Sequence, residues 1–270
     1  MKGTDDLTVV IPAWDLGAEL DECLDSIKAQ PIPCRILVVD NASKRPLPRR
    51  QGVRYLRLSQ RVTVGAARNA GLAAVETPYV LFMDGDDVLL PDSVPFLMRR
   101  LIEHPRAVAS AGRNVDWNPR RGSRKASTFP PGYAYQIQRF KRLFAILNMA
   151  SYCFPVIAVV IRTDAARRAG GFPDFNDREN WLFSMTLCFQ GRVLLHKRPV
   201  KLYRTGAERK TLSARKKRPL QETLRVIDHR MESATVPRWV RAMKRPIRRL
   251  QVRYLTYVHQ KRWSQRRDAS

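Results

Sequence analysis

Residues 79–87, with the sequence YVLFMDGDD, decide the fold class of this chain because an apolar run ends abruptly in acidic residues. A strand that is apolar on both faces is typical of a parallel sheet covered by helices on both sides. In such open sheets, ligands bind beyond the carboxyl ends of the strands. The stretch therefore predicts a buried strand that ends at Asp84 and a polar site beside it.

Strand and helix signals alternate on both sides of this stretch. Runs rich in β-branched and aliphatic residues predict strands over residues 8–12, 35–40, 53–58 and 107–111. Helical spacing of apolar residues predicts helices over residues 17–30 and 65–75, and a third that begins at Pro91. The alternation favours an α/β fold with a mostly parallel sheet flanked by helices.

The pattern is less regular in the second half of the chain. Arginines and a lysine lie among Pro, Gly and Ser over residues 116–133, which predicts a mobile basic loop. Beyond it, apolar patterning predicts helices over 135–150 and 176–190, and strands over 156–161, 193–195 and 200–203.

Charge divides the chain into two parts. The 270 residues are 44% hydrophobic, which is enough for a sizeable core, and the net charge is +26. Residues 197–270 hold 23 Lys+Arg against 5 Asp+Glu, so +18 of that charge lies there. We therefore predict an α/β domain over residues 1–205 and a basic, mostly helical extension over residues 206–270.

The extension carries one apolar helical stripe, which Pro246 is expected to kink or split. The stripe consists of Val236, Val240, Met243, Ile247, Leu250, Tyr254 and Tyr257. It could pack on the rest of the chain and leave the arginines in water. Alternatively, the helix could lie on an anionic membrane surface with Trp239, Tyr254 and Trp263 at the interface. Binding to nucleic acid is the least favoured alternative.

The acidic cluster after residue 83 points to a cation. Asp84, Asp86 and Asp87 repel one another unless they are solvated, hydrogen-bonded or bridged by a cation. Gly85 permits a sharp bend, and hard oxygen ligands suit Mg²⁺ or Mn²⁺. The alternative interpretation is an acidic turn in which Asp87 caps a helix.

Two further residues have a structural and a functional interpretation. Asp40 follows an apolar run, where its carboxylate could cap a helix or accept hydrogen bonds from a nucleobase or ribose. Arg68, within GAARNAG at residues 65–71, could be a surface charge or a guanidinium directed at phosphate.

Four motifs in one order identify a family. TVVIPA at 8–13, VVDNAS at 38–43, GAARNAG at 65–71 and YVLFMDGDD at 79–87 together resemble the family 2 glycosyltransferases of the GT-A fold. The resemblance covers roughly residues 7–204 and is less sharp after residue 156. It leaves residues 206–270 without an explanation.

The resemblance implies a donor site for a nucleoside-diphosphate sugar. Pro12 and Ala13 would line the nucleotide pocket, and Asp40 would contact the nucleobase. Arg68 would lie near the nucleotide or its phosphates. Members of this family transfer the sugar to an acceptor hydroxyl, usually with inversion.

The same resemblance implies a divalent metal, Mn²⁺ or Mg²⁺. Asp84 would reach the ribose, with Gly85 beside it in the donor site, and Asp86, together with Asp84, would hold the metal. Many relatives have a histidine after the last strand that helps to hold the metal. Here Thr205 and Gly206 take that place, so we expect Asp86 and the phosphate oxygens to hold it.

The expected catalytic base departs from the family pattern. An inverting enzyme needs a base that takes the proton of the acceptor hydroxyl. The family pattern is Glu-Asp-aromatic with Asp as the base, whereas this chain has Glu179-Asn180-Trp181. Asn180 cannot accept a proton at neutral pH. Glu179 is therefore the first candidate for the base, and Asp177 is the second.

Both Glu179 and Trp181 also have structural interpretations. The carboxylate of Glu179 could pair with Arg178 or Arg162. Trp181 could stack on an acceptor sugar or lie in the core.

Three classes of function compete. A glycosyltransferase that acts on a glycan or lipid-linked acceptor of the cell envelope leads. A nucleotidyltransferase is disfavoured, because no Gly-rich phosphate loop with lysine follows the first strand. A catalytically weak module that binds a nucleotide sugar or an anionic membrane is the non-enzyme alternative, because Asn180 replaces the usual base.

The sequence also predicts where the chain acts. The four cysteines form no CxxC pair, which favours free thiols in a reducing compartment. The first residues are polar rather than a signal peptide, and the longest apolar run, 153–161, is too short to span a bilayer. We therefore expect a cytoplasmic protein, peripheral on the inner face of the membrane, with nucleic acid an improbable partner.

Overall fold

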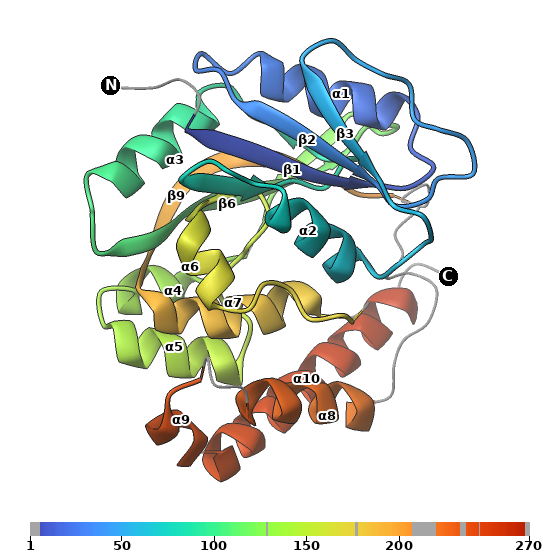
Figure 1. Ribbon diagram of the computed structural model, residues 1–270. Helices are drawn as coiled ribbons and strands as arrows, with labels where there is room; N and C mark the ends of the chain where they lie inside the picture. The colour runs from blue at the N-terminus through green and yellow to red at the C-terminus, as the bar shows by residue number, and fades with distance from the viewer. Residues whose placement is uncertain are drawn as a thin grey trace.

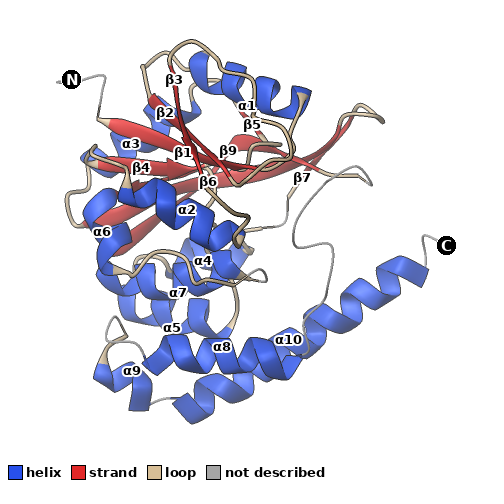
Figure 2. Ribbon diagram, turned by 45° about the vertical axis from the view of Figure 1, so that its right-hand side comes forward, coloured by secondary structure: helices blue, strands red, loops and turns tan. Residues whose placement is uncertain are grey.

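A computed structural model describes residues 6–127, 129–175, 178–206, 220–232, 236–242 and 244–267. A single curled sheet fills the upper half of Figure 1, and a group of helices covers its lower side. The helices nearest the C-terminus are α8, α9 and α10. In Figures 1 and 2, α8 and α9 lie below α5, and α10 runs from the bottom of the view upward to the right. The predicted α/β architecture is therefore confirmed.

The first half of the sheet is parallel. Its strands run in the order β3-β2-β1-β4, and every neighbouring pair is parallel. Their bounds are β1 Leu7–Ala13, β2 Arg35–Asp40, β3 Val53–Arg57 and β4 Tyr79–Phe82. Parallel pairing brings the carboxyl ends of β1, β2 and β4 to the same edge, where the motifs end.

The second half of the sheet is mixed. The order continues β8-β6-β9-β5, with β7 paired to β6. β8 is antiparallel to β4 and β6, whereas β6 and β9 are parallel. The bounds are β5 Val88–Leu89, β6 Ala107–Asn118, β7 Ser123–Ala126, β8 Val159–Arg162 and β9 Arg192–Arg204.

Alternate residues of each strand enter cores on opposite faces of the sheet, because side chains of a strand point alternately to its two sides. Val9 and Ile11 pack with α1 (Ala18–Lys28) and α3 (Ser93–Ile102). Val10 packs instead with α2 (Val64–Ala73), α6 (Thr163–Arg168) and α7 (Glu179–Gln190). The helix predicted to begin at Pro91 begins at Ser93, and its apolar residues Val94, Leu97, Met98 and Leu101 are buried.

The structure corrects three predicted elements. The predicted loop over 116–133 is wrong: β6 continues to Asn118 and forms a hairpin with β7. The strands predicted at 193–195 and 200–203 are one strand, β9, which follows β6 through irregular register. The polar residues 196–198, of which Lys197 and Arg198 are exposed, had interrupted its apolar pattern.

The helix predicted over 135–150 is two helices, α4 (Gly132–Ile137) and α5 (Lys141–Ala150). Gln138 lies between them, and its side-chain amide pairs with both backbone groups of Leu195 on β9. This long-range pairing holds the chain against the sheet at the point where a continuous helix would leave it.

The basic extension packs on the α/β part of the chain. It contains α8 (Leu220–Glu232), α9 (Arg238–Ala242) and α10 (Lys244–Arg267). Val236, Val240 and Ile247 are buried against residues of α5 and α7. For these residues, the alternative in which the extension packs on the rest of the chain is therefore correct. The domain boundary near residue 205 remains a prediction.

One member of the predicted stripe is misplaced. Leu250 is 45% exposed, and Gln251 is buried in its stead, where its amide donates to the carbonyl oxygen of Met149. Met243 and the side chain of Tyr257 lie outside the described residues. α9 ends at Ala242 and α10 begins at Lys244, so Pro246 lies in a first helical turn, where its missing N–H breaks no helical hydrogen bond.

Among the helices that the structure describes, none combines the length and apolar composition that a membrane crossing needs.

Acid is expected to destabilise the fold through His196. Burial, with help from Arg100 and His104, lowers the pKa of His196 to about 4. Between pH 6.5 and 4 the unfolded chain therefore binds a proton that the folded chain excludes, so stability falls as pH falls through this window. After allowance for solvent screening, the loss is on the order of 1 kcal/mol. Urea unfolding at pH 7 and pH 4.5 should show a smaller acid effect in His196→Gln; an equal loss in both proteins would contradict this assignment.

Candidate active site

The acidic turn after β4 gathers three carboxylates. The backbone N–H of Asp87 donates to the carbonyl oxygen of Asp84 at 3.1 Å, which closes the turn. One carboxylate oxygen from each of Asp84, Asp86 and Asp87 lies within 4.8 Å of the others. Gly85 has no left-handed backbone angle. A Cβ there would lie 2.6 Å from Leu16 Cδ1 and 3.2 Å from Ile11 Cγ2, so a larger residue would require the Leu16 side chain to move. The bend is present as predicted.

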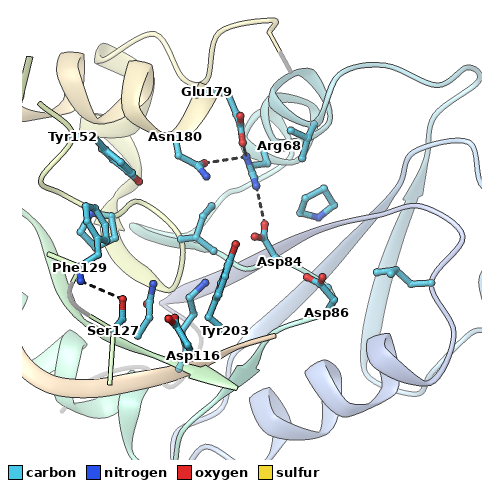
Figure 3. A pocket seen from close by; sticks show the side chains of 18 of the residues that line it. Arg68, Asp84, Asp86, Asp116, Ser127, Phe129, Tyr152, Glu179, Asn180 and Tyr203 are labelled. Carbon is cyan, nitrogen blue, oxygen red and sulfur yellow. Dashed lines mark hydrogen bonds and ion pairs between the residues drawn. The ribbon is translucent and has the colours of Figure 1, made fainter. Parts of the chain in front are cut away.

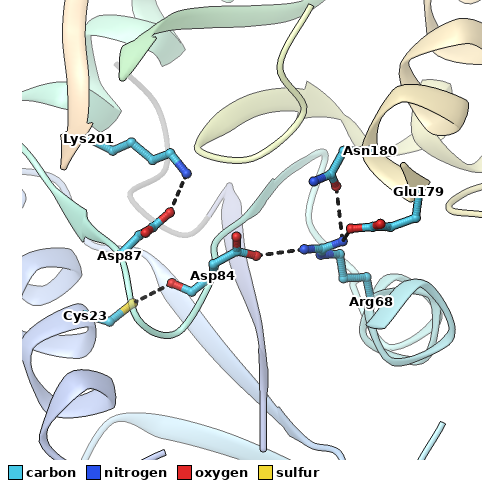
Figure 4. Close-up of polar contacts among 7 residues, drawn as sticks. All are labelled: Cys23, Arg68, Asp84, Asp87, Glu179, Asn180 and Lys201. Atoms are coloured by element: carbon cyan, nitrogen blue, oxygen red, sulfur yellow. Dashed lines mark hydrogen bonds and ion pairs between the residues drawn. The ribbon is translucent and has the colours of Figure 1, made fainter. Parts of the chain in front are cut away.

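Asp87 attaches this turn to β9. Its Oδ2 lies 2.5 Å from Lys201 Nζ, and its Oδ1 accepts a hydrogen bond from the backbone N–H of Arg204 at 3.0 Å. The side chains of Asp87 and Lys201 are both buried (Figure 4). The alternative in which Asp87 caps a helix is wrong, because the short strand β5 follows it.

Arg68 connects the acidic turn to α7. Its Nη2 lies 2.7 Å from Asp84 Oδ1, and its Nη1 lies 3.0 Å from Glu179 Oε1 and 3.1 Å from Asn180 Oδ1. Burial opposes the charge of this guanidinium, but Asp84 and Glu179 outweigh burial and raise the pKa of Arg68. Figure 4 shows Arg68 reaching from α2 between these two partners.

The position of Arg68 depends on close helix packing. A Cβ on Gly71 would lie 2.3 Å from Val10 Cγ1, so only glycine lets α2 approach β1 this closely. The Glu179 carboxylate forms an ion pair, as its structural interpretation expected, but the partner that the structure places there is Arg68. Arg162 donates to the backbone carbonyls of Leu101 and Ala107 instead.

These groups line a pocket of about 570 Å³. Seven of the residues predicted for the site line it: Pro12, Arg68, Asp84, Gly85, Asp86, Glu179 and Asn180. In Figure 3 the Arg68 guanidinium lies between Glu179 and Asp84, and Asp86 lies beyond Asp84. The structure thus brings together residues that are more than 160 positions apart in the sequence.

The opposite wall of the pocket was missed by sequence reasoning. It includes Asp116, Ser127, Phe129, Tyr152 and Tyr203. Asp116 and Ser127 lie in the region that had been predicted as a loop, and in fact they belong to the β6–β7 hairpin or follow it directly. A signal was available in the alternation of residues 113–118, which is compatible with a strand.

Burial changes the acidity of two groups on this wall. It raises the pKa of Asp116, against the opposing effects of Lys125 and Lys201. Burial, reinforced by Glu179, raises the pKa of Tyr152 well above its usual value. Asp116 is therefore a carboxylate that takes up a proton more readily than an exposed aspartate does.

Three residues predicted for the site do not line the pocket. Ala13 is buried. The carboxylate of Asp40 bonds to Arg57 Nη1 at 2.5 Å and to the backbone N–H of Ser43 at 2.9 Å. Trp181 is 1% exposed and donates to the carbonyl oxygen of Asn148 at 2.6 Å, which is the placement of a core residue. Asp177 lies outside the described residues.

Curated relatives match part of the chain. The uncharacterized glycosyltransferase YibD of Escherichia coli is 28% identical over 125 residues, which cover 43% of this chain and 36% of YibD. A teichoic acid poly(glycerol phosphate) polymerase of Staphylococcus epidermidis is 26% identical over 104 residues, which cover 35% of this chain and 14% of the polymerase. The matches thus span 36% of YibD and only 14% of the polymerase.

Solved structures match more of the chain. Residues 1–349 of S. aureus TarS, in complex with UDP-GlcNAc, give a TM-score of 0.64 at 18% identity and cover 93% of this chain and 71% of theirs. The mannosyltransferase PcManGT of Pyrobaculum calidifontis, in complex with GDP-Man and Mn²⁺, gives 0.55 at 18% identity, with 76% and 58% covered. These likenesses confirm the predicted GT-A fold.

Three of the four motifs contribute residues to the pocket. A family model also matches the chain directly. The model of glycosyl transferase family 2 matches residues 8–167, more than half of the chain. The chain therefore belongs to glycosyl transferase family 2.

Proposed function

We propose that this chain transfers a sugar from a nucleoside-diphosphate sugar to an acceptor hydroxyl, with inversion. The observation that carries the proposal is the pocket in which the Asp84 and Asp86 carboxylates lie beside the buried Arg68. UDP-GlcNAc in TarS and GDP-Man in PcManGT support a nucleotide-sugar donor. In the donor site, Pro12 would lie along the nucleotide. Ala13 and Asp40 are buried and do not line the pocket, so the contacts proposed for them, Asp40 with the nucleobase, would require a rearrangement that exposes them.

The acidic turn suits a divalent cation. Asp86, with Asp84, would hold Mn²⁺ or Mg²⁺, because carboxylate oxygens grouped within 4.8 Å form a hard donor set. The Mn²⁺ in PcManGT supports this choice. When bound, the cation would neutralise the charge that develops on the leaving diphosphate. Arg68 would hold the Asp84 carboxylate in position.

Removing the Asp86 carboxylate tests the proposal. In calorimetric titrations of UDP, GDP and dTDP, Mn²⁺ should strengthen binding of one nucleotide to the wild-type chain, and Asp86→Asn should abolish that gain. Sugar-nucleotide turnover should fall about 100-fold or more. Asp92→Asn makes the same chemical change outside the pocket, at a left-handed position that asparagine tolerates, and should behave like wild type. Equal Mn²⁺ dependence in wild type and Asp86→Asn would refute the metal site.

The base is proposed to be Glu179, because it adjoins Asn180, where the family pattern has its aspartate. Its Oε1 accepts a hydrogen bond from Arg68, which leaves the other carboxylate oxygen for the acceptor hydroxyl. Asp116 is the competing carboxylate on the opposite wall, with a pKa already raised by burial. Asp177 is the remaining candidate from the sequence.

The variants Glu179→Gln and Asp116→Asn distinguish the two pocket acids. Loss of the base should lower kcat on the order of 10²–10⁴-fold, with donor affinity nearly unchanged. We expect this pattern for Glu179→Gln and a smaller change for Asp116→Asn. The reverse ranking would transfer the role to Asp116.

A weakly catalytic module that binds a nucleotide sugar is a second candidate. It is favoured by Asn180, whose side-chain oxygen accepts a hydrogen bond from Arg68 where a base would be expected. If the wild-type chain binds nucleotide without transferring or hydrolysing any UDP-, GDP- or dTDP-sugar, and Asn180→Asp gains turnover, this second function is correct.

The acceptor is proposed to be a glycan or lipid-linked intermediate of the cell envelope. The matches to a teichoic acid polymerase and to the succinoglycan biosynthesis protein ExoO of Rhizobium meliloti support this class. Such an acceptor would place the chain at the cytoplasmic face of the membrane, where the basic region 206–270 could meet anionic lipid.

A further inference from the structure

A short exposed segment at the start of α5 combines cations with large apolar side chains. Residues 139–143 have the sequence RFKRL, and all five are exposed. Phe140 is 52% and Leu143 is 45% exposed. Trp239 of α9, 40% exposed, lies beside them, with Arg142 over its ring at 5.9 Å. We call residues 139–143 together with Trp239 the α5 face; α9 lies next to α5 in both Figures 1 and 2.

The charge around the α5 face has one sign. Residues 117–163 contain eight Lys and Arg and neither Asp nor Glu. Two neighbouring hollows continue the basic surface, one lined by Lys141, Arg106 and Arg192, the other by Arg139 and Arg192. The acid that does line one of them, Asp164, is paired with Arg168 at 2.5 Å. The surface therefore has the charge that complements rows of phosphates.

Local rules of helix formation are broken at this place. Phe140 occupies the N-cap position of α5 and makes no side-chain cap hydrogen bond, although small polar residues are preferred there. Lys141 and Arg142 lie in the first turn, where the helix dipole disfavours cations. Helix capping and burial in the core therefore do not account for the exposed Phe140 or for the cations in the first turn.

We propose that the α5 face docks on the anionic surface of a lipid bilayer. Phe140, Leu143 and Trp239 would enter the headgroup region, and Arg139, Lys141 and Arg142 would lie among the lipid phosphates. Exposed apolar side chains within a basic surface fit the interface of a bilayer, where they can leave water while the cations remain among the headgroups. Nucleic acid, which can also contact cations and aromatic rings, is distinguished by the experiment below.

The α5 face shares Trp239 with the membrane contact expected from the sequence alone, but it adds residues 139–143, which lie outside the extension. Tyr254 instead packs on the buried Trp181, with ring centroids 5.6 Å apart. α5 runs from the exposed segment to Ala150, two residues before Tyr152 on the pocket wall. Docking here would therefore hold the pocket about one helix length, roughly 15 Å, from the bilayer surface.

Vesicle co-sedimentation of the full chain tests the proposal. The anionic vesicles contain phosphatidylcholine with about 30% phosphatidylglycerol, which represents an anionic leaflet. The chain should bind these vesicles more tightly than it binds vesicles of pure phosphatidylcholine. The variant Arg139→Gln/Lys141→Gln/Arg142→Gln should lower this binding on the order of 100-fold. Phe140→Ser/Leu143→Ser should lower it at least about 10-fold and abolish the blue shift of tryptophan fluorescence on vesicle addition.

Matched controls keep the result specific. Lys44→Gln/Arg45→Gln removes exposed charges near the other edge of the sheet, and Ile102→Ser removes a 49% exposed apolar side chain. Both should bind vesicles like wild type, and circular dichroism should show all variants folded. Wild-type binding by the two α5 variants would overturn the proposal. Equal affinity of the chain for RNA and for anionic vesicles at the same salt concentration would also overturn it, because that result would assign the face to nucleic acid.

Discussion

Replacing Arg68 by methionine is expected to lower the free energy of unfolding by about 3–5 kcal/mol. Arg68 is 2% exposed and holds Asp84 and Glu179 on opposite sides. Methionine has a similar length but no charge, so both carboxylates would be left in the protein interior without their partner. Urea denaturation at pH 7.5 gives the change directly.

Two further variants show whether charge is the cause. Adding Glu179→Gln to Arg68→Met removes one of the two uncompensated carboxylates and should recover part of the loss. Arg100→Met breaks an exposed pair with Glu103, at 40% and 46% side-chain exposure, and should cost less than about 1 kcal/mol. A loss below 1 kcal/mol for Arg68→Met would mean that the three side chains do not form the buried cluster described above.

Lys201→Met is the second substitution with a large expected effect, again about 3–5 kcal/mol. Asp87 is fully buried, and Lys201 Nζ lies 2.5 Å from its Oδ2. Without the ammonium group, the carboxylate must remain charged in the interior or take up a proton. Both outcomes weaken the attachment of the acidic turn to β9, so we also expect weaker Mn²⁺-dependent nucleotide binding.

The double variant Lys201→Met/Asp87→Asn should recover much of that stability. Asparagine keeps an oxygen for the backbone N–H of Arg204, which donates to Asp87 Oδ1 in the wild-type chain. Lys197→Met makes the same change at an exposed position of β9 and should be nearly neutral. If the single and double variants were equally unstable, lost packing of the lysine stem rather than the buried charge would be the cause.

Local sequence was sufficient for the elements of the first half of the chain. β2 has the predicted bounds, and β1, α1, α2 and β4 differ from prediction only at their ends. These elements are short, strongly patterned and ended by turn residues, so nearby residues specify them. The second half depends on long-range pairing: Gln138 separates α4 from α5 through its bonds to Leu195, and β6 extends because β7 and β9 pair with it.

The candidate site likewise has one part that the sequence predicts and one part that depends on the tertiary structure. Seven of its predicted residues meet in one pocket. Pro12, Asp84, Gly85 and Asp86 do so because the carboxyl ends of β1 and β4 share one edge of the sheet, whereas the other three reach the pocket from α2 and α7. Asp116 and Tyr152 on the facing wall belong to segments that no motif marks. Their place depends on the hairpin and on the turn after α5.

The sequence by itself determined the family, the α/β order of the first half and the residues at the strand ends, because hydrophobic period and motif spacing are local properties. Only the tertiary structure decided the partners of the charges. Arg68 binds both Asp84 and Glu179, Asp87 binds Lys201, and Trp181 enters the core. Each of these contacts joins residues far apart in the chain. Burial then makes the pairing of each charge a requirement of the fold, which the spacing of residues along the sequence does not express.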